Sequence, residues 1–309
     1  MRTLLVIILL LSAFPAWAGP GWAPVEKILG KPGTVQGDGF KILFPRTDLN
    51  VVVNGIPLEP EMGLSSWFAF MPLSRGTFMA GELVLLDQEV PKVTALAVEN
   101  GLEVTALLNP LLGESPSIRV LRVQGRGSKS YLAQLAKTLL SATGTPLGPT
   151  PQAQGSLENP SSGATPLSTP QKHGMGEPLL SKIQAILGPG QAEEDILHYE
   201  IPRSEAVTEG GMEIPSYVGL ETCFFLKKEG EMLLGAGDFI LTGEEVNPVE
   251  KTLSQNHITV TAVTSLLQRE SPRLFLLRFW VCGDPKETAE GLIEALSLLQ
   301  SGTEKGSQE

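Results

Sequence analysis

The sequence predicts an α+β protein made of two tandem copies of one domain, each a mixed or antiparallel sheet with helices on one face. The main observation is a duplication, because residues 63–125 align without a gap on residues 219–281 and share 19 identities in 63 positions. The end of each copy has the order strand, helix, strand, strand, helix, for which ferredoxin-like packing is one candidate. A hydrophobic fraction of 42% in 309 residues is enough to give two domains a core each.

The individual elements follow from hydrophobic periodicity and turn residues. In the first copy, strands are expected where apolar runs end at Gly, Pro or Asn turns, at residues 40–46, 50–55, 67–73, 77–87, 102–108 and 117–125. Helices are expected where apolar residues recur every three or four positions, at residues 25–30, 89–100 and 131–142. The second copy repeats the later part of this order, with strands at 235–243, 257–263 and 273–281 and helices at 244–256 and 287–299.

The two ends of the chain and its middle differ in composition from the copies. Residues 1–18 have the charged start, short apolar run and A-x-A site of a signal peptide. Residues 144–178 hold seven prolines, six glycines and eight Ser/Thr, which is typical of an extended linker. We therefore expect a signal peptide (1–18), a first copy (19–143), a linker (144–178), a second copy (179–301) and a polar tail (302–309).

The signal peptide predicts a periplasmic or secreted protein whose mature chain begins near Gly19, after cleavage near Ala18. The residue directly after the cleavage site is not a cysteine, so a lipid anchor is not expected. No other apolar stretch is long enough to span a bilayer. The net charge of −11 comes from the second half, because residues 179–309 carry 10 Lys+Arg against 21 Asp+Glu. Neither half has the basic balance of a nucleic-acid binder.

The chain has two cysteines, Cys223 and Cys282. In an oxidising compartment they could form one disulfide, and two buried free thiols are the alternative. The C-x-x-C spacing of a redox site is absent.

The segments GELVLLDQEV, VTALLNPLLGESP and ESPRLFLLRFW resemble the LppY/LpqO family, an exported bacterial domain of unknown function, and the resemblance covers both copies. It implies a His-Asn-His run after VTAL and a further histidine in the strand after the E-x-P turn, which together could bind a metal. This chain has Leu108, Asn109 and Pro110 at the run in the first copy, and Arg122 and Arg278 at the strand positions. We therefore expect no metal site of that kind in either copy, and no cofactor.

Five residues around the E-S-P turns are the remaining candidates for a binding site: Asn109, Glu114, Arg122, Glu270 and Arg278. Each arginine could hold an anionic group bidentately in a pocket, or it could pair with a neighbouring carboxylate. Each glutamate could serve such a pocket, or it could accept backbone N–H groups in a turn. Glu114 and Arg122 are expected at the start and in the middle of one strand, too far apart to pair.

The sequence thus favours an exported, non-catalytic binding or interaction protein whose partner is an unidentified small molecule or envelope component. The alternative is a hydrolase-like envelope enzyme that uses residues other than histidine. That alternative requires Asn109, Glu114 and Arg122, or their second-copy counterparts, to converge in one concave site.

Overall fold

The computed structural model describes residues 21–148, 177–193 and 195–300. The expected signal peptide, most of the expected linker and the expected polar tail lie outside these residues. Among the described residues, none of the helices has both the length and the apolar character needed to cross a membrane.

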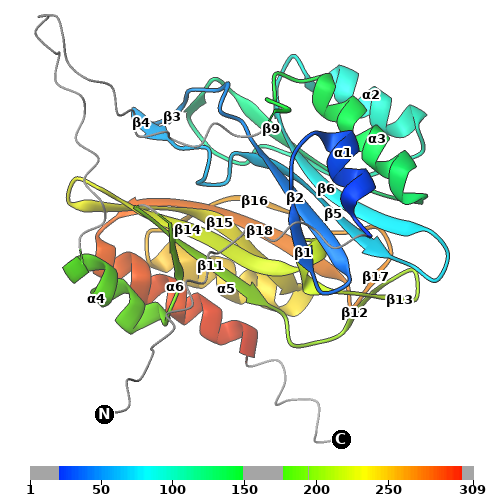
Figure 1. The fold of residues 1–309 in the computed structure, drawn as a ribbon. Helices are drawn as coiled ribbons and strands as arrows, with labels where there is room; N and C mark the ends of the chain where they lie inside the picture. Colours follow the sequence, from blue (N-terminus) through cyan, green and yellow to red (C-terminus); the bar gives the residue numbers. More distant parts are fainter. Residues whose placement is uncertain (1–20, 149–176, 194, 301–309) are drawn as a thin grey trace, which may run out of the picture.

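Within the described residues, each copy contains a six-stranded sheet, a small three-stranded sheet and three α-helices (Figure 1). The elements of the first copy are α1 (Ala23–Leu29), β1 (Thr34–Gln36), β2 (Gly39–Pro45), β3 (Val51–Val53), β4 (Ile56–Leu58), β5 (Ser65–Pro72), β6 (Thr77–Leu86), α2 (Val90–Glu99), β7 (Glu103–Leu108), β8 (Glu114–Ser115), β9 (Ile118–Gly127) and α3 (Lys129–Ser141). Those of the second copy are α4 (Glu177–Leu187), β10 (Gln191–Glu193), β11 (Ile196–Pro202), β12 (Val207–Glu209), β13 (Met212–Ile214), the 3-10 turn η1 (Ser216–Val218), β14 (Glu221–Glu229), β15 (Met232–Thr242), α5 (Gly243–Gln255), β16 (Thr259–Ser265), β17 (Glu270–Ser271), β18 (Leu274–Gly283) and α6 (Pro285–Gln300).

The predicted fold class is confirmed, and every strand pair in the described part of the chain is antiparallel. The large sheets have equivalent strand orders, β1-β2-β5-β6-β9-β7 and β10-β11-β14-β15-β18-β16. In the first of them β9 lies between β6 and β7, with α2 as the crossover, which is the split β-α-β arrangement of ferredoxin-like packing.

An equivalent arginine joins the sheet to a helix in both copies. Arg46 follows β2, is fully buried, and binds Glu89 at the start of α2 (3.0 Å) and Asp48 (2.9 Å). Arg203 repeats this arrangement with Glu245 (2.9 Å) at the start of α5. A buried guanidinium needs such carboxylate partners, which explains why the Pro-Arg pair recurs in the sequence.

The two copies pack against each other through their sheets, and the helices cover the outer faces (Figure 1). Side chains of α1 and α3 pack on the outer face of the first sheet, and side chains of α5 and α6 pack on the second. Between the sheets, one apolar cluster joins Val84 and Val120 of the first copy to Leu234 and Trp280 of the second. Another joins residues of β5 and β6 to residues of β12, β13 and η1. The small sheet of each copy therefore contributes to an apolar cluster shared with the other copy.

Candidate functional site

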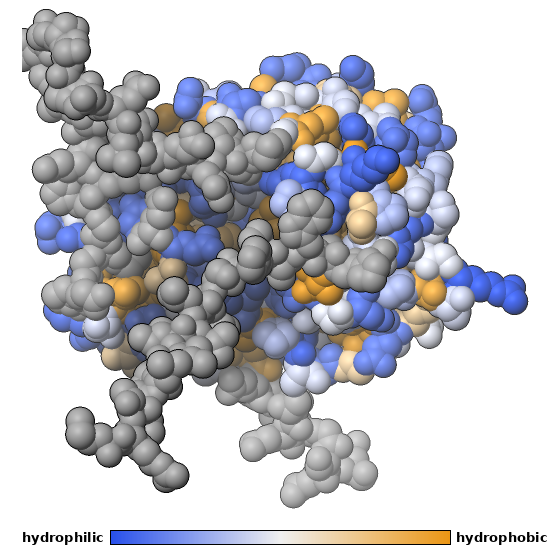
Figure 2. Space-filling view, in the orientation of Figure 1, coloured by the Kyte–Doolittle hydropathy of each residue, from blue (hydrophilic) through white to orange (hydrophobic). Residues whose placement is uncertain are grey.

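A cleft of about 880 Å³ lies between the inner faces of the two large sheets. Residues of both copies line it, so neither copy alone forms this site. Beside the cleft the backbone of the second copy approaches the first copy closely at Gly219, whose φ is +90° and where an added Cβ would lie 2.7 Å from the ring of Trp67. Figure 2 shows hydrophilic and hydrophobic residues interspersed on the face of the molecule that is in view. A concave site of this size, between two domains, suits a small organic molecule.

Two pairs of equivalent charged residues form the floor of the cleft. Glu82 on β6 faces Arg122 on β9 in the first sheet, and Asp238 on β15 faces Arg278 on β18 in the second. Their neighbours in sequence, such as Leu83 and Leu121, point to the helix-covered core, because side chains alternate along a strand. The four charged side chains therefore all face the other copy.

The floor charges form one network across the interface. Glu82 binds Arg122 at 3.3 Å and Arg278 of the second copy at 3.0 Å. Arg278 also binds both carboxylate oxygens of Asp238 at 2.6 Å. Burial alone would raise the pKa of Glu82, but the charges of Arg278 and Arg122 outweigh it and hold that pKa below its ordinary value of 4.5.

A second group of charges lies nearer the edge of the sheets. Lys41 on β2 lies 3.7 Å from Glu200 and 3.8 Å from Glu221, both in the second copy. Its ammonium also lies over the ring of Trp67, 5.6 Å from the centroid, and Arg122 contacts the same ring. The three Lys and Arg side chains in the described lining of the cleft, Lys41, Arg122 and Arg278, thus all pair with carboxylates.

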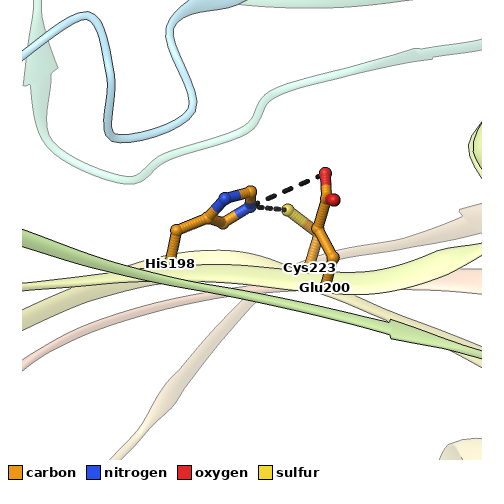
Figure 3. Close-up of side chains that lie close together, drawn as sticks. All are labelled: His198, Glu200 and Cys223. Carbon is orange, nitrogen blue, oxygen red and sulfur yellow. Dashed lines mark hydrogen bonds and ion pairs between the residues drawn. The ribbon is translucent and has the colours of Figure 1, made fainter. Parts of the chain in front are cut away.

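His198, Glu200 and Cys223 come together on one wall of the cleft (Figure 3). His198 and Glu200 are two residues apart on β11, so they share a face, and the antiparallel register places Cys223 of β14 opposite Glu200. The Nε2 of His198 lies 3.1 Å from the Sγ of Cys223 and 3.8 Å from Oε1 of Glu200. Burial raises the pKa of the Cys223 thiol, with Glu200 adding to the shift, and burial lowers the pKa of His198. Without a bound cation, both groups are therefore neutral at pH 7.

Of the five residues predicted for a site, only the two arginines line the cleft. Glu114 accepts a hydrogen bond from the backbone N–H of Ile118 (3.4 Å), and Glu270 accepts one from Leu274 (3.3 Å), as turn residues do. The side chain of Asn109 binds Arg119 (3.4 Å). Asn109, Glu114 and Arg122 therefore do not converge in this cleft, and of Glu270 and Arg278 only the arginine lines it.

The expectation that Glu114 and Arg122 share one strand is wrong. Glu114 belongs to β8, which pairs with β3, and Arg122 belongs to β9, which pairs with β6 and β7. The chain changes direction between them at the cis peptide bond Ser115–Pro116, and Ser271–Pro272 repeats this in the second copy.

The disulfide that the sequence left open is not formed, because Cys223 and Cys282 are both free thiols. Cys223 is opposite Asp238 of β15, whereas Cys282 is opposite Leu234 on the other side of that strand. Two strand spacings of about 4.8 Å and four residues of about 3.4 Å each separate them. This is well beyond the Cα separation of about 7 Å that a disulfide tolerates. Cys282 is also exposed, contrary to the expectation of two buried thiols.

Several residues of the cleft were not predicted from the sequence, namely Lys41, Trp67, Glu82, His198, Glu200, Glu221, Cys223 and Asp238. A signal existed for two of them. Glu82 and Asp238 occupy equivalent positions, 156 residues apart, each inside an otherwise apolar strand. A charge repeated at one place in a buried strand requires a partner. For His198 and Cys223 no sequence signal was present, because the register of β11 and β14 brings them together.

The fold and the cleft define a duplicated α+β protein with a polar site between its two copies. The chain belongs to the family described as Domain of Unknown Function (DUF1259), which matches residues 23–142 and again residues 181–298. No curated protein matches the chain. Among solved structures, a trimeric bacterial microcompartment shell protein, PduB, is similar over 90% of this chain and 93% of its own, with 11% identity and a TM-score of 0.24. A similarity this low supports no inference about function.

Proposed function

We propose that this chain is an exported, non-catalytic binding protein that holds a small organic cation in the cleft between its two copies. The observation that carries the proposal is the charge of the cleft. Its described lining contains eight carboxylates and three Lys or Arg side chains. The carboxylates are Glu59, Glu61, Glu82, Glu193, Asp195, Glu200, Glu221 and Asp238.

The excess of carboxylates favours a positively charged ligand. The lysine and arginine side chains of the lining already pair with carboxylates, so they are not available to an anion. Glu61 and Glu193 have exposed side chains on the lining and add negative potential there. Clefts lined by one sign of charge concentrate ligands of the opposite sign. Apolar side chains such as Leu58, Met62 and Phe225 can cover the hydrocarbon part of such a ligand.

The non-catalytic part of the proposal is supported by the residues of the E-S-P turns. The resemblance to the LppY/LpqO family, which is part of this proposal, implies a histidine site whose positions hold Leu108 and Pro110 in the first copy and Arg122 and Arg278 in the two strands. Arginine has no free lone pair for a metal. The export part is supported by residues 1–18, and mass spectrometry of the protein from the periplasm or medium should find Gly19 at its N-terminus.

Isothermal titration calorimetry tests the proposal, with spermidine as a cationic probe and succinate as an anionic one. The mature protein should bind spermidine, bind no succinate, and lose spermidine affinity as salt rises. The double variant Glu61→Gln/Glu193→Gln should bind spermidine at least about fivefold more weakly, since each charge is worth on the order of 1 kcal/mol at this range. The matched control is Glu99→Gln/Glu287→Gln, which removes two exposed carboxylates outside the cleft. Equal loss in both double variants would exclude the cleft as the site.

A further inference from the structure

We propose that His198, Glu200 and Cys223 form a binding site for one divalent transition metal ion, and that Zn²⁺ is the ion their donors suit best. The inference goes beyond the organic ligand proposed above, because the three side chains lie together whether or not a cation enters the cleft. Imidazole, carboxylate and thiolate are the three protein donors that Zn²⁺ uses. Their donor atoms lie within 4.8 Å of one another.

The spacing of the donors fits tetrahedral coordination. Zinc bonds of about 2.3 Å to sulfur and about 2.1 Å to nitrogen and oxygen place the donors of a tetrahedral site about 3.4 to 3.6 Å apart. The observed separations are 3.1 Å for His198 and Cys223 and 3.8 Å for His198 and Glu200. Both lie within about half an ångström of the tetrahedral values, which side-chain rotation alone can supply.

The strands hold these side chains in place. The three residues lie on adjacent strands of one sheet and face the same side of it (Figure 3). The ring of His198 stacks on Phe225, with centroids 4.4 Å apart and planes 7° apart, which fixes the direction of Nε2. Three protein ligands leave a fourth position for water or a ligand, and this wall belongs to the cleft.

The surroundings of Cys223 favour a bound cation over a reactive thiolate. A nucleophilic cysteine needs positive neighbours that stabilise its thiolate. Cys223 instead lies opposite Glu200 on one neighbouring strand and opposite Asp238 on the other, and Glu221 is two residues away on the same face of β14. A divalent ion compensates the charges of a thiolate and a carboxylate together, which the neutral imidazole of His198 does not.

Among the described residues, this group of three donors occurs once. The alignment of Phe44-Pro45-Arg46 with Ile201-Pro202-Arg203 places Lys41 and Leu43 where the second copy has His198 and Glu200. Trp67 stands where the second copy has Cys223. The first copy therefore has no donor at these three positions that binds zinc, and the expected stoichiometry is one ion per chain. These positions also differ from the histidine positions that the LppY/LpqO resemblance implies.

Titration of the reduced mature protein with Co²⁺ tests this site, because a thiolate ligand gives cobalt a charge-transfer band in the near ultraviolet. We expect the band to saturate at one equivalent of Co²⁺ and to disappear when Zn²⁺ is added. Cys223→Ser should abolish the band. His198→Ala and Glu200→Gln should weaken Co²⁺ binding by more than about tenfold, since even outer-shell partners of a metal contribute 10- to 100-fold.

The chain offers matched controls, because Cys282 and His257 are exposed and lie outside the cleft. Cys282→Ser and His257→Asn should leave the band and its stoichiometry unchanged. The absence of a cobalt band in the wild type, or its persistence in Cys223→Ser, would overturn the proposal. Circular dichroism identifies any variant that fails to fold, and His198→Ala and Glu200→Gln then decide the question. If the wild type binds Co²⁺ but not spermidine, the result would exclude the organic cation as a ligand and leave the metal site in place.

Discussion

Arg278 of the second copy donates a hydrogen bond to Glu82 of the first copy at 3.0 Å, in the buried floor of the cleft. Glu82 also pairs with Arg122 of its own sheet, so one carboxylate compensates two guanidinium groups. This contact ties the duplicated domains together at positions that are equivalent in the two sheets. It also makes Glu82 the floor residue whose removal has the largest expected effect.

Substitution of Glu82 by Gln should destabilise the protein by about 3 to 5 kcal/mol, because it leaves buried arginine charge without its partner. The side chain keeps its shape, so the loss reports the charge alone. Urea unfolding followed by circular dichroism measures the free energy of unfolding. Glu99→Gln, on the exposed surface of α2, is the control and should stay within about 0.5 kcal/mol of the wild type. A loss below 1 kcal/mol for Glu82→Gln would contradict the network.

Acid should destabilise the folded wild-type protein, because it protonates the carboxylate of Glu82. The folded pKa of Glu82 lies below its ordinary value of 4.5, so its contribution to stability is present above that pH. The contribution is lost as the pH falls through the lower, folded pKa. Urea midpoints measured between pH 7 and pH 3 should therefore fall more steeply in the wild type than in Glu82→Gln. Parallel curves for the two proteins would show that Glu82 does not titrate in this way.

The two copies should unfold in one cooperative transition, because the apolar clusters between the sheets combine side chains of both. Trp280 is buried in one of these clusters, and Trp280→Ala should destabilise the protein by about 3 to 5 kcal/mol. In a variant that begins at Gly19, the remaining tryptophans, Trp22 and Trp67, both belong to the first copy. Their fluorescence should nevertheless show the full loss of stability. The unfolding midpoint from fluorescence should equal the midpoint from circular dichroism.

The control for this experiment is Ile293→Ala, which changes an exposed residue of α6 in the same copy. Ile293→Ala should change the midpoint of the unfolding transition only slightly. If the fluorescence midpoint of Trp280→Ala stays at the wild-type position while circular dichroism becomes biphasic, the copies unfold independently.

The elements of the fold were predictable because local patterns determine them. The apolar run at residues 77–87 became β6, and the helical periodicity of residues 131–142 became α3. The cleft depends on contacts that local patterns do not encode. Arg278 lies 196 residues from Glu82, and His198 lies 25 residues from Cys223. Such pairs follow from strand register and from the packing of two sheets, which periodicity within one strand cannot specify.

Lys41 should weaken metal binding, because its ammonium competes for Glu200. The Nζ of Lys41 lies 3.7 Å from Oε1 of Glu200, and a positive charge near the three donors also repels an incoming cation. Lys41→Met keeps the apolar stem and removes the charge. At this distance a unit charge is worth about 1 kcal/mol in water, so the dissociation constant for Co²⁺ should fall roughly fivefold.

Cobalt titration of Lys41→Met, followed by the charge-transfer band, measures this change in affinity. Lys251→Met removes an exposed lysine of α5 and should leave the dissociation constant unchanged, although it alters the net charge equally. This comparison separates a local effect on Glu200 from the general attraction of an acidic protein for cations. An unchanged or weaker affinity in Lys41→Met would show that Glu200 does not bind the ion, since a Glu200 freed from its lysine should bind the ion better. His198 and Cys223 would then be the only protein donors of the site, and Glu200→Gln would leave cobalt binding intact.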